Sequence, residues 1–172
     1  MQEKTTKRTI TGTSINLLVA ATVSVLALAS PAVAADKLIP FNGSLNAQEA
    51  ISAGPAPGTF VADGTGGGIA TLIGRFTLTW KFTVTIADGT GLGPVRFTAA
   101  NGDEIFTTAA GISWPADTPG VFHIREIQTI TGGTGRFAGA KGTFVVERLT
   151  DLNTGATSGS FQGTMTLPVA AN

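Results

Sequence analysis

The sequence predicts an all-β domain, a closed antiparallel barrel of about eight strands. Polar and apolar residues alternate strictly over twelve positions from Arg75 to Ile86, the pattern of a strand with one buried face. Seven further runs follow this pattern between glycine-rich turns, with no convincing helix. The strands carry few charges that would protect an open sheet edge, and closing the sheet into a barrel removes its edges.

The first 34 residues predict a cleaved signal peptide. Lys4, Lys7 and Arg8 precede an apolar run of 15 residues from Ile15 to Ala29, shorter than the roughly 20 residues of a membrane-spanning helix. Ala32-Val33-Ala34 then supplies the small residues that a signal peptidase requires. We therefore expect export, to the periplasm or out of the cell. The alternative is an uncleaved anchor close to the membrane.

Cleavage after residue 34 leaves a single domain of 138 residues, 35–172, enough for one hydrophobic core. Its ends, 35–38 and 168–172, are predicted to be weakly structured. Because the sequence has no cysteine, burial and strand pairing must hold the exported domain together without disulfides. Eight Lys and Arg against ten Asp and Glu give this part a formal charge of −2 and no basic cluster. Nucleic acid and anionic membrane are therefore poor partners, and no stable membrane insertion is expected after cleavage.

Each strand is predicted from its own alternation and from the turns around it. The strands in order are Ile39–Leu45, Gly68–Ile73, Arg75–Ile86, Val95–Ala99, Glu104–Ala110, Val121–Thr131, Lys141–Thr150 and Gly159–Leu167. The first two are weak and flank a Gly, Pro and Ala loop at 53–58. Asn101-Gly102, between two alternating runs, is a strong hairpin signal. We expect a longer connection from Trp114 to Gly120, a tight turn at Gly132–Gly135, where glycine supplies positive φ, and a last hairpin turn at Asp151–Gly155.

The segment Gly133–Ala138 matches the glycine pattern of dinucleotide-binding proteins, but its context excludes that function. The dinucleotide pattern requires a helix that starts within it and a parallel sheet beyond it. Here Gly139 and Gly142 follow at once, and then a strand pattern. We therefore interpret the segment as a tight turn between two strands and predict no nucleotide cofactor.

His123 is the only histidine, which excludes metal sites built on two or three imidazoles, and no metal or other cofactor is predicted. His123 and Arg125 share one strand face, whereas Glu126 and Gln128 share the other. In the simplest interpretation one pair is solvated and the other is satisfied inside the fold; the alternative places a polar group in a ligand pocket. With no Gly-x-Ser-x-Gly motif, a serine protease-like triad would have to assemble around His123 from unrelated strands.

Threonines dominate one face of several strands, and we expect that face to be the solvated outside of the barrel. The alternative, an ice-binding ladder, needs a regular repeat that their spacing lacks. These threonines are Thr77, Thr79, Thr83, Thr85, Thr107, Thr164 and Thr166.

The segment Ile130–Gly142 resembles the allene oxide cyclase and dirigent barrels of plants, and it is still more similar to their exported bacterial relatives of unassigned function. Gly74-Arg75-Phe76-Thr77 and Thr98–Asp103 add to the bacterial resemblance, which spans roughly residues 64–167. The resemblance implies an eight-stranded, calycin-like barrel with an apolar lumen, often packed as a homotrimer. The resemblance supports an inference about the fold more than one about the activity, because the glycine motif specifies a turn and a turn indicates the fold rather than the chemistry.

The resemblance also implies two activities. Cyclases of this family shape a reactive epoxide with help from a carboxylate on the first strand, and dirigent proteins steer radical coupling without oxidising anything themselves. Here the predicted first strand contains no carboxylate, and the nearest is Glu49. The pocket aspartates of dirigent proteins find no clear counterpart.

Three functions are compatible with these observations. The first is a non-catalytic exported barrel that binds a small hydrophobic molecule against an apolar wall of Phe76, Leu78, Trp80, Phe82 and Phe97. The second is an isomerase or stereochemical guide without metal or nucleotide cofactor, in which the lumen holds a polar group from Glu104, His123, Glu126 or Glu147. The third is a structural surface protein with a filled core. The placement of these side chains distinguishes the three.

Overall fold

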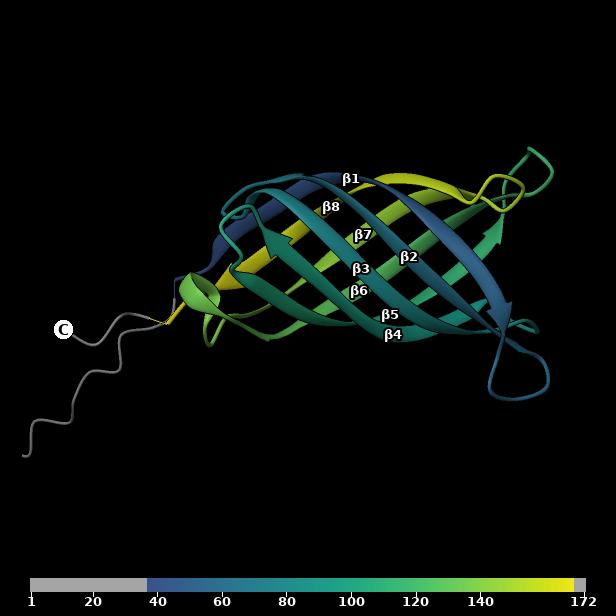
Figure 1. The fold of residues 1–172 in the computed structure, drawn as a ribbon, viewed down its shortest axis with the longest axis horizontal. Helices are drawn as coiled ribbons and strands as arrows, with labels where there is room; N and C mark the ends of the chain where they lie inside the picture. Colours follow the sequence, from purple (N-terminus) through teal and green to yellow (C-terminus); the bar gives the residue numbers. More distant parts are fainter. Residues whose placement is uncertain (1–36, 169–172) are drawn as a thin grey trace, which may run out of the picture. The chain divides into compact units, whose positions relative to one another are not determined.

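The computed structural model describes residues 37–168 and confirms a closed antiparallel barrel. Its strands follow one another in chain order, and β8 pairs with β1 to close the sheet (Figure 1). The elements are β1 (Ile39–Ala53), β2 (Thr59–Ala70), β3 (Gly74–Thr85), β4 (Thr90–Ala99), β5 (Glu104–Pro115), β6 (Val121–Gly133), η1 (Gly135–Phe137), β7 (Lys141–Asp151) and β8 (Ala156–Thr166). The predicted signal peptide, 1–34, lies outside the described residues. Within 37–168, no helix is long and apolar enough to cross a membrane.

The first two strands are longer than the sequence predicts. β1 continues to Ala53, eight residues beyond the predicted end at Leu45, and β2 begins at Thr59 instead of Gly68. Their added parts contain many Gly, Ala, Asn and Gln residues, which have weak or no strand preference. Pairing with β8 and β3 on their far sides supplies the ladder hydrogen bonds that hold these segments extended.

Other boundaries also differ from the prediction, and β4 begins at Thr90 instead of Val95. Leu72 and Ile73 lie in the turn before β3 and not in a strand, and Leu72 has a positive φ of 65°. Trp114 and Pro115 belong to the end of β5, where they pair with β6, and not to a connection. Gly132 and Gly133 end β6 rather than forming the tight turn, which begins after them with η1.

The alternation seen in the sequence places one set of side chains in the lumen and the other outside. In β3, Phe76, Leu78, Trp80 and Phe82 are buried, while the threonines between them are exposed. Thr107 departs from the expected solvated threonine face, because it is buried in the lumen with 3% of its surface exposed. Its hydroxyl donates to Gln128 Oε1 at 2.6 Å, which compensates the loss of hydration.

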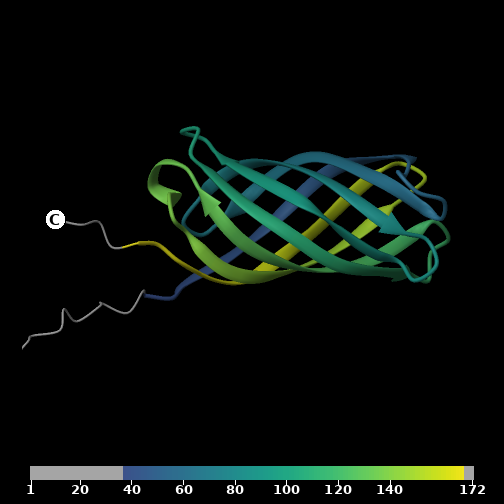
Figure 2. The same ribbon diagram turned by 90° about the horizontal axis from the view of Figure 1, so that it is seen from below.

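The barrel has two different ends. We call the end that carries the β1–β2, β3–β4, β5–β6 and β7–β8 turns the open end, and the end that carries η1 the plugged end. At the plugged end, Phe137 of η1 is almost fully buried, and Arg136 Nη2 donates to the carbonyl of Ile73 at 3.1 Å. Arg136 Nε also lies 3.7 Å from Asp103 Oδ2. Arg136 therefore connects the β6–β7 turn, in which it lies, to the β2–β3 and β4–β5 turns. Figure 2 shows η1 at the same end of the barrel as the beginning of β1 and the end of β8.

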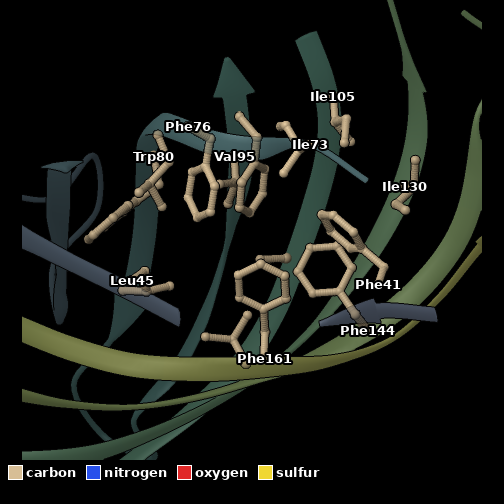
Figure 3. Packing of buried hydrophobic residues seen from close by; sticks show 14 of the residues in the cluster. Phe41, Leu45, Ile73, Phe76, Trp80, Val95, Ile105, Ile130, Phe144 and Phe161 are labelled. Atoms are coloured by element: carbon tan, nitrogen blue, oxygen red, sulfur yellow. The ribbon is translucent and has the colours of Figure 1, made fainter. Parts of the chain in front are cut away.

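Aromatic side chains fill the lumen near the plugged end. The rings of Phe41, Phe76, Phe97, Phe144 and Phe161 form pairs whose centroids lie 5.1 to 6.4 Å apart, many edge to face. Figure 3 shows Phe41, Phe144 and Phe161 pointing toward one another from strands on one side of the barrel, with Phe76 facing them. Such ring pairs add about 0.5–1.5 kcal/mol each beyond the area they bury. This half of the barrel is therefore a packed core and leaves no room for a ligand.

Candidate ligand-binding site

A cavity of about 470 Å³ lies in the other half of the lumen and reaches the open end. Its wall is mostly apolar and includes Phe60, Ala62, Phe82, Val84, Phe122 and Ile124. Its floor is polar and consists of Glu49, Glu126, Arg148 and Thr150. Both the volume and the combination of an apolar wall with a few polar groups are typical of small-molecule pockets.

Arg148 of β7 lies at the centre of the floor between two carboxylates. Its Nε and Nη2 donate to Glu126 Oε1 at 3.1 and 2.9 Å, and its Nη1 donates to Glu49 Oε2 at 3.1 Å. The side chains of Arg148 and Glu49 are 4% exposed and that of Glu126 is 7% exposed. Buried charges persist only when they are paired and hydrogen-bonded in this way. Two carboxylates and one guanidinium leave the floor with a formal charge of −1.

The register of the barrel places a glycine beside each large side chain of the floor. Gly111 stands opposite Glu126, and Gly159 stands opposite Arg148. A Cβ atom on Gly111 would lie 2.8 Å from Glu126 Cγ, and one on Gly159 would lie 2.6 Å from Arg148 Cβ. These glycines therefore provide the space in which the charged side chains turn across the lumen.

Gly64 has the same role between β1 and β3. It pairs with Glu49 on one side and with Trp80 on the other, and a Cβ atom there would overlap the indole ring. Because Gly64 has no side chain, Trp80 extends across it and its Nε1 donates to Glu49 Oε2 at 3.1 Å. The indole ring also lies 5.1 Å from Arg148 Cζ, within cation–π range.

A second set of hydrogen bonds orients the floor from below and from the side. Gln128 Nε2 donates to Glu126 Oε2 at 3.0 Å. Arg148 Nη1 also reaches the hydroxyls of Thr150 and Thr157 at 2.7 and 3.0 Å. Thr150 in turn donates to Thr157, whose hydroxyl lies 2.9 Å from the carbonyl of Leu149. The floor is thus held in one geometry before any ligand arrives, which lowers the cost of binding.

The residues predicted as an apolar wall all point into the lumen but lie at different depths. Phe82 lines the cavity. Trp80 lies at the boundary, against Glu49 and Arg148, whereas Phe76 and Phe97 belong to the aromatic filling. Leu78 is buried next to that filling and does not line the cavity. The sequence thus predicts which face is internal without locating the cavity along the strands.

Of the four predicted polar candidates, only Glu126 reaches the lumen. His123 is on the outer face, stacked on Trp114 with ring centroids 5.5 Å apart. Glu147 is also outside, 3.7 Å from Arg125, with 68% of its side chain exposed. Glu104 lies at the plugged end, 3.6 Å from Arg96. The sequence left open which pair of β6 is solvated: in the structure His123 and Arg125 are exposed, and Glu126 and Gln128 are buried and hydrogen-bonded. Glu126 also lines the cavity, as in the alternative interpretation.

Sequence reasoning missed Glu49 and Arg148. Glu49 was placed beyond the first strand, but the odd-numbered series Phe41, Leu45 and Glu49 continues on one face, so the added length of β1 carries the carboxylate into the lumen. Arg148 has the same parity as the buried Val146. Whether a residue has an odd or an even number within its strand decides which face it occupies. With the true strand lengths, this alternation alone would have placed both residues in the lumen.

The described residues contain no group of three or more His, Cys, Asp or Glu side chains that could hold a metal ion. The floor instead offers carboxylate oxygens, a guanidinium and hydroxyls at the bottom of an apolar cavity. Such a floor can orient one polar group of a ligand by hydrogen bonds and can stabilise positive charge near the carboxylates.

Fold and site together define a closed eight-stranded barrel whose lumen holds a ligand-sized cavity. Among solved structures, a pterocarpan synthase dirigent protein matches with a TM-score of 0.56 and 16% sequence identity, over 81% of this chain and 96% of that chain. The barrel therefore has a dirigent-like fold. No family model and no curated protein sequence matches the chain.

Proposed function

We propose that the protein is an exported barrel that binds one small, largely apolar molecule in the open-end cavity without catalysis. The observation that carries this proposal is the change in packing along the lumen. Small barrels of eight strands either fill the interior with side chains or leave room for one ligand. Here the aromatic filling ends at Trp80, and about 470 Å³ of mostly apolar space lies beyond it.

The hydrogen bonds of the floor favour binding over proton transfer. Glu49 and Glu126 both accept from Arg148, and Glu126 accepts from Gln128 as well. A general acid or base must come within hydrogen-bond reach of the proton it moves, whereas three of the four oxygens of these carboxylates already accept from Arg148, Trp80 or Gln128. The floor is suited to holding a ligand in place.

The direct test uses the protein as it is made in its own host. Native mass spectrometry of the purified mature protein, followed by solvent extraction, is expected to show a retained small molecule at about one per barrel. An empty protein that also fails to bind hydrophobic fluorescent probes would contradict the proposal and favour a structural protein.

A pair of variants on β5 tests whether the cavity is the binding site. Ala109 lines the cavity, and its neighbour Ala110 is exposed on the outer face. Ala109→Leu is expected to weaken binding of a cavity-sized apolar probe at least about tenfold, because the added carbons occupy ligand space. Ala110→Leu is the matched control and leaves binding unchanged. Equal affinities for the two variants would place the ligand elsewhere.

A stereochemical guide or isomerase is the second candidate, and two observations favour it. The fold is shared with a pterocarpan synthase dirigent protein, and Glu49, on the first strand, projects into the lumen beside Glu126. The test is chiral chromatography of phenoxyl-radical coupling products, with an added one-electron oxidant, in the presence and absence of the protein. An enantiomeric excess would support the guide, and racemic products would support passive binding.

A further inference from the structure

We infer, on the basis of the binding function proposed above, that the ligand carries a protonated amine at its inner end and that Glu49 receives it. The ligand class is thus a small aryl or alkyl amine, inserted with its ammonium group toward the floor and its hydrocarbon part against the apolar wall. The hydrogen bonds, the charges and the wall support this inference separately.

Most hydrogen-bond donors of the floor are already engaged. Arg148 donates to Glu126, Glu49, Thr150 and Thr157. The two N–H groups of Nη1 share three of these acceptors, the Nε N–H and one Nη2 N–H bind Glu126, and the second Nη2 N–H has no acceptor among the described residues. Trp80 Nε1 is bound to Glu49. The floor therefore has little left to donate to a ligand's oxygen.

One acceptor of the floor is free. Glu49 Oε2 accepts from Trp80 and Arg148, whereas Glu49 Oε1 has no hydrogen-bond partner among the described residues. The described residues contain no fully buried side-chain oxygen or nitrogen that lacks a partner. Oε1 must therefore keep some contact with the cavity, although its side chain is only 4% exposed. A ligand atom that meets Oε1 has to be a donor.

The charges of the cavity favour a cationic donor over a neutral one. Glu49 and Glu126 face a single cation, Arg148, and no other Lys or Arg is among the lining residues. Asp88, at the rim near the open end, adds a further acidic group. An ammonium group would neutralise the floor, while a carboxylate would add a second uncompensated negative charge in a water-poor site. Charge-assisted hydrogen bonds are about twice as strong as neutral ones.

The wall fits the remaining part of such a ligand. Phe60, Phe82 and Phe122 line the cavity above the floor, and aromatic faces attract both hydrocarbon and cationic groups. An amine with a short apolar tail would therefore contact aromatic rings along its length and the Glu49 carboxylate at its inner end.

The experiment compares three probes that differ only in their head group: 4-phenylbutylamine, 4-phenylbutan-1-ol and 4-phenylbutanoate. Trp80 is the reporter, since it touches Glu49, and the exposed Trp114 is removed by Trp114→Phe. Titrations at pH 7 are followed by Trp80 fluorescence and checked by calorimetry. The amine is expected to bind at least about tenfold more tightly than the alcohol, the difference expected of a charge-assisted hydrogen bond, and the carboxylate most weakly.

Glu49→Gln tests the assignment of the acceptor, because it removes the charge and keeps the shape. The preference for the amine over the alcohol is expected to fall to about threefold or less. Glu147→Gln makes the same change on the exposed outer face and keeps the full preference. The ranking of the three probes on the protein with native Glu49 tests the inference even if the Glu49 variant does not fold.

Four outcomes are distinguishable. A tight amine whose advantage disappears in Glu49→Gln supports the inference. An alcohol or carboxylate that binds as tightly as the amine overturns it while the binding function stands. An amine advantage that survives Glu49→Gln overturns the assignment to Glu49. If none of the probes binds, the cavity does not bind such molecules, and the inference fails together with the proposed function.

Discussion

Replacing Arg148 by methionine would test the floor of the cavity as a structural unit. The substitution removes five hydrogen bonds and leaves the carboxylates of Glu49 and Glu126 facing each other without a cation. Removing one partner of a buried ion pair costs about 3–5 kcal/mol. For a domain of this size, 1 kcal/mol shifts the melting temperature by about 3–5 °C. We therefore expect Arg148→Met to lower it by roughly 10–20 °C.

A matched control lies on the same two strands. Arg125 and Glu147 form an ion pair of β6 and β7 on the outer face, 3.7 Å apart, with 58% and 68% of their side chains exposed. Such a surface pair contributes about 0–1 kcal/mol, so Arg125→Met is expected to lower the free energy of unfolding by less than about 1 kcal/mol. The two variants delete the same side chain on opposite faces of the sheet.

The measurements are thermal unfolding, which gives the melting temperature, and urea unfolding, with midpoints compared at equal slopes, both followed by far-ultraviolet circular dichroism. Replacing Glu49 and Glu126 by glutamine together with Arg148→Met is expected to recover at least half of the loss, because no uncompensated charge then remains. The reasoning is refuted if Arg148→Met and Arg125→Met are equally stable, or if the triple variant is less stable than the single one.

Two further predictions concern the plugged end and the turns at the open end. Phe137→Ala is expected to lower the free energy of unfolding by about 3–5 kcal/mol, because Phe137 is 1% exposed, while probe affinity at the open end stays within about twofold; a loss of affinity in a folded variant would contradict the separation of the two halves. The hydroxyl of Thr90 lowers the pKa of Asp88, and the backbone N–H of Asn153 lowers the pKa of Asp151, from a usual value of 3.8. Since the folded state favours the ionised form, the contribution of these groups to stability is complete above about pH 4 and is lost as the pH falls through their lower folded pKa values. The double variant Asp88→Asn/Asp151→Asn is therefore expected to lose less melting temperature between pH 4 and pH 2 than the native chain, and an equal loss would show that these turns do not contribute.

The strands with strict alternation were predictable, and the weakly patterned ones were not. β3 begins and ends within one residue of its prediction, since period two over aromatic and threonine residues allows no other structure. The later part of β1, from Asn46 to Ala53, contains no aromatic residue and only one β-branched residue, Ile51. Its strand form depends on partners on both sides, which is long-range information that a local pattern does not contain.

The same limit explains the candidate site. Glu126 could be singled out because it lies well within the predicted strand, which begins at Val121 as in the structure, so its face could be compared with that of His123. Glu49 could not, since the predicted strand ended four residues before it. The position along the barrel at which the packed core ends and the cavity begins depends on side chains from all the strands. The alternation within one strand shows only whether a side chain points inward or outward.

The division of the lumen into a packed half and a hollow half has a consequence for protein engineering. Ala62, Phe82 and Ala109 shape the cavity without taking part in the aromatic filling. Their size could be varied to retarget the barrel to other guests, while the five phenylalanines continue to supply the folding energy. Because Trp80 stands where the two halves meet, such a redesigned receptor would carry its own optical signal and would need no attached dye.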